Sequence, residues 1–138
     1  MSNRVLVVDD EPSDVDLLKS YLADVSDEIQ GLTDSRRVEQ AFKDFEPDIV
    51  VLNLHMPDPD GLELLRRLRS ARESLGYLPV IVLTTDKSKV ARNAALILGA
   101  DDFLTKPLDR QEVVLRVRNL LRTRHLFVEA RWRPPQIL

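Results

Sequence analysis

The chain of 138 residues contains no cysteine. Disulfide bonds, zinc–thiolate sites and thiol nucleophiles are therefore excluded, and a reducing, cytoplasmic setting is expected. The chain also lacks long apolar runs. None approaches the roughly 20 residues that a membrane helix needs, and no signal-peptide core precedes the strand-like run that is reached by Val5. We therefore expect a soluble, unprocessed protein that does not interact with a membrane.

An excess of positive charge is also missing. The formal net charge is -3 and the sequence pI is near 5.4. Broad nucleic-acid binding relies on a basic surface that displaces counterions from phosphates, so we expect no direct contact with nucleic acid. The length and the 43% hydrophobic content are sufficient for one domain with a sizeable core.

Five short apolar runs have the length and composition of β-strands. They are residues 4–9, 28–32, 48–53, 78–84 and 101–105. The first, third and fourth runs consist almost entirely of Val, Ile and Leu. Such continuity indicates strands that are buried on both faces, as in a parallel sheet that lies between two layers of helices.

The segments between these runs have apolar residues at helical spacing. The five apolar stripes are Val15, Leu18, Leu22 and Val25; Val38, Ala41, Phe42 and Phe45; Leu62, Leu65 and Leu68; Val90, Ala94 and Leu98; and Val113, Val117, Leu120 and Leu121. Strands and helices thus alternate along the chain. This order predicts right-handed crossovers and an α/β fold of three layers, with helices on both faces of a doubly wound, five-stranded parallel sheet.

The pattern changes towards the C-terminus. A helical continuation to about Ala130 is expected, and Pro134-Pro135 should end it. We therefore divide the chain into a compact domain of residues 1–122 and a C-terminal helical extension of residues 123–138, which resembles the stub of a linker to a separate effector.

Polar residues stand at the ends of four predicted strands. Asp9 and Asp10 close the first, Asn53 the third, Thr84 the fourth and Lys106 the fifth. Each alone could cap a helix or form a turn. Together they are expected to share one rim, because ligand sites of parallel sheets form beyond the carboxyl ends of the strands. Oxygen ligands without cysteine suit a hard, loosely held ion such as Mg²⁺.

The segment from Asn53 to Gly61 is a turn rich in Pro that leads into a helix capped by Asp60. His55 lies within this turn. A lone histidine in a surface loop is usually solvated, so we expect its backbone carbonyl to matter more than its ring.

Four segments, VLVVDDEP, DIVVLNLHMPDPDG, VIVLTT and GADDFLTKPL, follow one another in this order. They closely resemble the receiver domain of bacterial two-component response regulators, over about residues 4–121. The resemblance implies a flavodoxin-like (CheY-like) fold and an aspartyl-phosphate switch that is supported by Mg²⁺. It also implies a signalling module and not an enzyme, with a sensor histidine kinase or a phosphotransfer protein as the donor of the phosphoryl group.

The resemblance assigns roles to single residues. Asp9 and Asp10 match the acidic pair of the metal site, and His55 matches the position that offers its backbone carbonyl to the metal. Asn53 occupies the phosphoacceptor position, which also belongs to the metal site and where aspartate is expected. The remaining matches lie on the fourth and fifth strands.

Thr84 matches the hydroxyl that turns towards the phosphoryl group, and Lys106 matches the lysine that pairs with it. Phe103 matches the aromatic residue that changes rotamer when the domain switches. Lys106-Pro107 resembles the cis peptide bond of the family.

Asn53 is the main departure from the family pattern. An amide oxygen is a poor nucleophile and forms no stable acyl phosphate, so phosphorylation at this position should fail and Mg²⁺ binding should weaken. One interpretation is a receiver whose phosphoacceptor aspartate has been replaced, which locks it in the unphosphorylated state. The alternative is a natural, phosphorylation-independent pseudo-receiver that acts as a protein-interaction adaptor.

Other functions have less support from the residues. A Mg²⁺-dependent phosphatase would also need an aspartate nucleophile at position 53, and the chain has neither a G-x-G-x-x-G turn nor a P-loop. A homodimer is possible through the fourth helix, fifth strand and fifth helix. There, charged positions resemble those that pair across the symmetric dimer of DNA-binding members of the family: Arg92, Asp102, Glu112 and Arg116.

Overall fold

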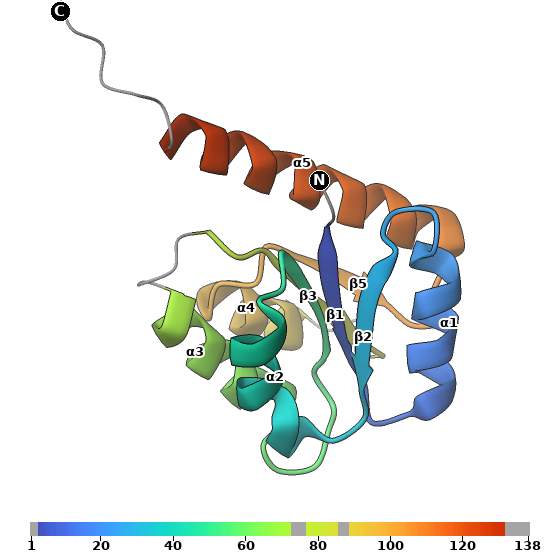
Figure 1. The fold of residues 1–138 in the computed structure, drawn as a ribbon. Coiled ribbons are helices and arrows are strands. Elements are labelled where there is room, and N and C mark those ends of the chain that lie inside the picture. The colour runs from blue at the N-terminus through green and yellow to red at the C-terminus, as the bar shows by residue number, and fades with distance from the viewer. Residues whose placement is uncertain (1–2, 73–76, 86–88, 132–138) are drawn as a thin grey trace, which may run out of the picture.

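A computed structural model of the protein describes residues 3–72, 77–85 and 89–131 (Figure 1). The elements are β1 (Arg4–Val8), α1 (Pro12–Leu22), β2 (Glu28–Leu32), the 3₁₀ turn η1 (Ser35–Arg37), α2 (Val38–Phe45), β3 (Ile49–Asn53), α3 (Gly61–Arg72), β4 (Val80–Thr84), α4 (Lys89–Ile97), β5 (Asp102–Thr105) and α5 (Arg110–Arg131). All strand pairs are parallel, in the order β2-β1-β3-β4-β5. The predicted doubly wound α/β fold is confirmed.

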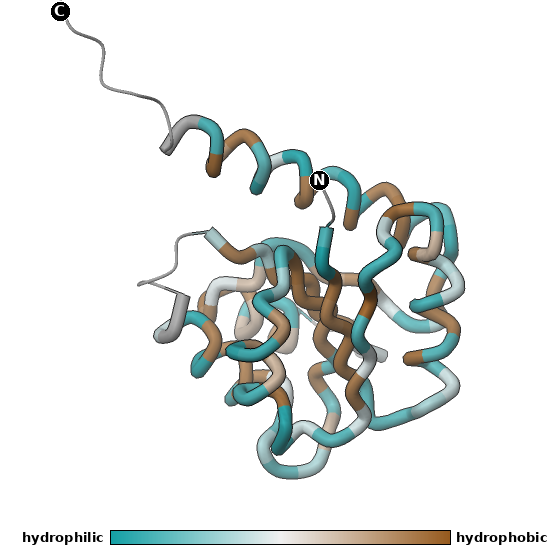
Figure 2. Tube along the Cα trace, viewed as in Figure 1, coloured by the Kyte–Doolittle hydropathy of each residue, from teal (hydrophilic) through white to brown (hydrophobic). Residues whose placement is uncertain are grey.

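Two hydrophobic cores lie on opposite faces of the sheet. Along β1, Val5 and Val7 pack with α1 and α5, whereas Leu6 and Val8 pack with α2, α3 and α4. This division follows from the alternation of side chains along a strand. Figure 2 shows the result as apolar strands enclosed between two layers of helices. The central strands β3 and β4 are buried at every position, as their continuous apolar runs predict.

The helical stripes are correct in most places, but α4 differs. The side chain of Val90, which was predicted to face the core, is 79% exposed, and Ala95 is instead fully buried. Alanine is a small residue and gives a weak signal in a hydrophobic pattern. In α3 the sequence also missed Leu64, which is fully buried.

The ends of the helices explain which polar residues remain available for a site. α1 begins with Pro12 at its first turn, and its N-cap is Glu11, which makes no side-chain capping hydrogen bond. Asp10 is therefore not the capping residue of α1. η1 is capped by Asp34, whose carboxylate accepts from the Arg36 backbone N–H. The predicted cis peptide bond between Lys106 and Pro107 is present.

α5 continues as one helix to Arg131, which confirms the predicted helical continuation; Pro134-Pro135 lies outside the described residues. Its second half runs past the N-terminal end of β1 (Figure 1). Arg124 Nη1 lies 3.0 Å from Asp48 Oδ1, and the rings of Phe127 and Tyr77 are 5.5 Å apart at their centroids. The division at residue 122 therefore falls within a continuous helix that packs against the domain, and it stays a prediction.

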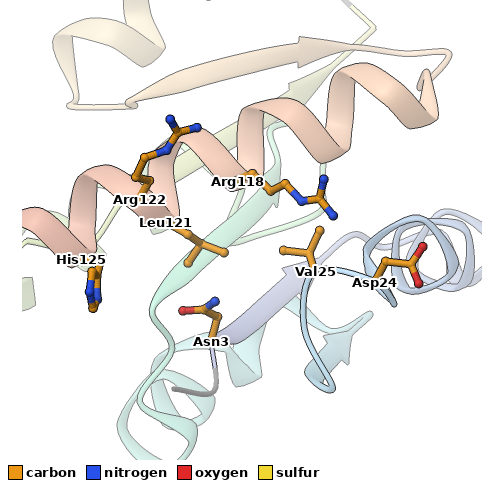
Figure 3. Close-up of a pocket in the computed structure, with 7 residues that line it drawn as sticks. All are labelled: Asn3, Asp24, Val25, Arg118, Leu121, Arg122 and His125. Atoms are coloured by element: carbon orange, nitrogen blue, oxygen red, sulfur yellow. The ribbon is translucent and has the colours of Figure 1, made fainter.

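A pocket of about 380 Å³ lies beside α5 at this end of the sheet (Figure 3). It is lined by Asn3, Asp24, Val25, Arg118, Leu121, Arg122 and His125. Because Asn3 precedes β1, the pocket is at the end of the sheet opposite to the predicted rim of polar residues. No helix within the described residues is long and apolar enough to cross a membrane.

Candidate functional site

The predicted rim forms at the C-terminal ends of the strands, the lower end of the sheet in Figure 1. β1 pairs with β3 so that Val8 is opposite Leu52, which places Asp9 beside Asn53. Asp9, Asn53 and Thr84 are all buried. Three polar side chains at the ends of three adjacent strands are thus withdrawn from solvent, and their hydrogen bonds decide what the site can do.

The amide group of Asn53 is the centre of this site. Asn53 Nδ2 lies 3.3 Å from Asp9 Oδ1, 3.2 Å from Asp10 Oδ1 and 3.1 Å from the backbone oxygen of His55. Since all three neighbours are acceptors, the atom that faces them has to be the donor nitrogen and not the amide oxygen. The two N–H groups of the uncharged amide are therefore shared among the three oxygens that the family resemblance assigns to the metal.

Lys106 supplies the positive charge of the site. Its Nζ lies 2.7 Å from Asp9 Oδ2 and 2.9 Å from Asp14 Oδ2. Burial raises the pKa of Asp9 above its ordinary value, although Lys106 opposes this effect. Burial acts to lower the pKa of Lys106, but its hydrogen bonds to Asp9 and Asp14 outweigh burial and raise it. Lys106 is therefore a protonated ammonium group whose single positive charge is shared by two carboxylates.

Asp14 was not predicted as a site residue. It lies in the first turn of α1, where an acidic residue is common because the helix dipole stabilises negative charge there. The available signal was its place in the first turn of the helix that follows the acidic pair. This place did not reveal its partner, because Lys106 lies 92 residues away in the sequence.

His55 is exposed and uses its backbone carbonyl, as expected, but its ring also makes a contact that the sequence did not predict. His55 Nε2 lies 2.9 Å from Thr84 Oγ1, although the residue as a whole is exposed. Its carbonyl meanwhile accepts from Asn53, as described above. The backbone carbonyl of His55 thus contacts Asn53 at the end of β3, and its ring contacts Thr84 at the end of β4. His55 therefore connects the two strand ends.

Phe103 on β5 is half-buried against the core on the α4 side of the sheet. The guanidinium of Arg92 lies over its ring, 4.0 Å from the centroid. Such a cation–π contact contributes about 0.5–1 kcal/mol at an exposed site. Arg92 of α4 therefore stabilises one rotamer of the predicted switch residue.

The arrangement does not fit a divalent metal as it stands. Asp9, Asp10 and the His55 carbonyl all point towards Asn53 Nδ2, a donor that would repel a cation, and the second oxygen of Asp9 is bound by Lys106. Among the described residues, no group of three or more His, Cys, Asp or Glu side chains is arranged to hold a metal ion. A metal could use these oxygens only after the amide of Asn53 has turned away.

Access to the site remains open beside Asp10. A cavity of about 380 Å³ is lined by Asp10, Thr33, Asp34, Ser35, Arg36, Pro57 and Asp58. The hydroxyl of Ser35 donates to the backbone oxygen of Pro57 at 3.1 Å and so links η1 to the loop that follows β3. A small molecule or a side chain of another protein can therefore approach the site between these two loops.

The comparisons with known proteins agree with this geometry. The family description "Response regulator receiver domain" matches residues 5–118. The chain belongs to this family.

Two curated relatives are transcriptional regulatory proteins. TrcR of Mycobacterium tuberculosis is 42% identical over 119 residues, which are 86% of this chain and 45% of the relative. The virulence regulator PhoP of Salmonella typhimurium is 39% identical over 119 residues, which are 86% of this chain and 52% of the relative. This chain therefore spans about half the length of the curated relatives that it matches.

Solved structures include the receiver domain of the Francisella response regulator 1452, with a TM-score of 0.79 and 28% identity over 88% of this chain and 98% of that one. A receiver domain protein (CheY-like) from Methanospirillum hungatei has a TM-score of 0.82 at 21% identity, covering 91% and 98% of the two chains. The latter likeness concerns the fold alone.

Proposed function

We propose that this chain is the receiver of a two-component response regulator in which Asn53 stands at the phosphoacceptor position. The chain is then not an enzyme and accepts no phosphoryl group from a sensor histidine kinase or phosphotransfer protein. It remains in the unphosphorylated arrangement, in which Asn53 and Lys106 bind the acidic residues of the site. Its setting is the cytoplasm, and its output passes to a downstream effector domain or protein.

The observation that carries this proposal is the position of the Asn53 amide. A phosphoacceptor has to present an oxygen nucleophile, but Asn53 presents a nitrogen that is engaged by three acceptors. An amide is also too weak a nucleophile to form a stable acyl phosphate. The same nitrogen supplies donors to the acidic pair in place of a metal, so weakened Mg²⁺ binding is part of the proposal.

Incubation with acetyl phosphate and Mg²⁺ tests the proposal. The native chain should gain no phosphoryl group by mass spectrometry, whereas the Asn53→Asp variant should gain one that is lost on treatment with base, as acyl phosphates are. Asn119→Asp on the exposed face of α5 is the matched control, since it makes the same chemical change outside the site. Phosphorylation of the native chain at another residue, or an inert Asn53→Asp variant, would contradict the proposal.

The alternative is a phosphorylation-independent adaptor of the same fold. It is favoured by the hydrogen bonds within the site. The acidic side chains already bind the amide of Asn53 and the ammonium of Lys106. The two functions differ in the Asn53→Asp variant. A locked switch should regain a structural response to beryllofluoride at α4 and β5, visible by NMR, and an adaptor should regain none.

Homodimerisation through α4, β5 and α5 is a further part of the proposal. Apolar side chains are exposed on these helices, among them Val90 (79%), Ile97 (84%) and Leu115 (50%). The charged residues of this face have partners within the chain, because Arg116 binds Asp102 at 2.8 Å. A dimer through this face would have to exchange such pairs, so its formation should be weak. Light scattering that finds only monomer at millimolar concentration would rule it out.

A further inference from the structure

Lys106 is shared between two carboxylates on one side of the site. Asp9 belongs to the strand end and Asp14 to the first turn of α1, and both are bound through the same ammonium group. The side chains of Lys106 and Asp14 are 15% and 28% exposed, respectively, so solvent screens this pair only partly. No hydrogen bond within the described residues joins Lys106 to Asn53.

An ammonium group has three N–H donors on a flexible stem, and its position is set by the acceptors that surround it. With Asp9 alone as partner, Lys106 could turn about the strand end towards position 53. With Asp14 as a second partner, the ammonium is drawn towards α1. Asp14 also adds a negative charge near any anion that would approach Lys106.

We propose that Asp14 is a positioning residue, which holds Lys106 on the α1 side of the site and thereby limits the affinity of the site for a phosphoryl-like anion. This inference rests on the proposed function, because the anion is the one that a receiver would bind at position 53. No hydrogen bond within the described residues joins the Asp14 side chain to Asn53, Asp9 or Asp10, so its positioning effect is exerted through Lys106.

The ion pair itself is tested in the native chain by a double-mutant cycle. Asp14→Asn and Lys106→Met are combined, and the equilibrium constant of unfolding is measured in urea. The two substitutions should be coupled by at least about threefold in that constant. Asp16→Asn is the matched control, because Asp16 is exposed on the same helix and has no hydrogen bond or ion pair among the described residues. Absence of coupling between positions 14 and 106, or equal coupling with Asp16→Asn, would overturn the proposal.

The effect on the anion is tested with beryllofluoride in the Asn53→Asp background, at saturating Mg²⁺. Adding Asp14→Asn should lower the dissociation constant of beryllofluoride about three- to tenfold, because Lys106 is released and a negative charge is removed. Adding Asp16→Asn should change it less than twofold, and Asp14→Glu should retain the weaker binding.

The outcomes separate the two proposals. An Asn53→Asp variant that binds no beryllofluoride contradicts the proposed function, and the double-mutant cycle then decides alone whether Asp14 holds Lys106. If beryllofluoride binds but Asp14→Asn changes its affinity no more than Asp16→Asn does, the positioning role is wrong while the receiver function stands.

Discussion

Replacing Asn53 with aspartate should lower the free energy of unfolding of the metal-free domain by about 3 kcal/mol, the magnitude expected when a buried charge loses its compensation. Asn53 is 4% exposed. Its substitution would place a third carboxylate against Asp9 and Asp10 and would remove the donor that three oxygens now share. Lys106 cannot offset all of this charge, because Asp9 and Asp14 already bind it.

Mg²⁺ should reverse this loss in the variant and should change the native chain little. A ligand present at 100 times its dissociation constant stabilises a protein by about 2.7 kcal/mol, enough to restore most of the difference. Urea denaturation with and without Mg²⁺ measures both effects. Asn119→Asp should change stability by no more than about 0.5 kcal/mol, as is usual at the surface. A variant that is as stable as the native chain without metal would show that the amide does not stabilise the acidic pair.

The parts of the fold that could be predicted are those fixed by local patterns. The continuous apolar runs at β3 and β4 require burial on both faces of a sheet, and both strands are found within two residues of their predicted bounds. Since parallel strands end at the same edge, the sequence predicted that Asp9 and Asn53 share one rim. The register of β1 and β3 then brings them side by side.

The contacts that the sequence did not reveal depend on the rotation of helices and on side-chain rotamers. Asp14 meets Lys106 only because α1 packs against the sheet in one orientation, and a hydrophobic pattern does not determine where its polar residues point. The ring of His55 reaches Thr84 through a choice of rotamer in a loop. Val90 was assigned to the core because it is large and apolar, yet Ala95 is the residue of α4 that is fully buried.

Gly61 connects the fold to the site, and its replacement with alanine should lower the free energy of unfolding by about 2–3 kcal/mol, as overpacking of a close contact does. An added Cβ would lie 2.3 Å from the backbone oxygen of Asn53 and 2.4 Å from Cα of Leu54. These are backbone atoms that cannot turn aside. The N–H of Gly61 also donates to the backbone oxygen of Leu54 at 3.0 Å, which holds the start of α3 against the end of β3.

The same substitution should therefore disturb the site as well as the stability. Movement of the backbone at Asn53 would change the distances from its amide to Asp9 and Asp10, so its side-chain NH₂ signals should shift in a ¹⁵N-edited NMR spectrum. Gly31→Ala is the control for overpacking away from Asn53, because the nearest atoms there are Cγ1 of Val15 at 2.4 Å and Cε of Lys19 at 2.9 Å. It should also lower stability, since Val15 is buried and stiff, but it should leave the Asn53 signals in place. If both variants shifted these signals equally, contact with Gly61 would not be what positions Asn53.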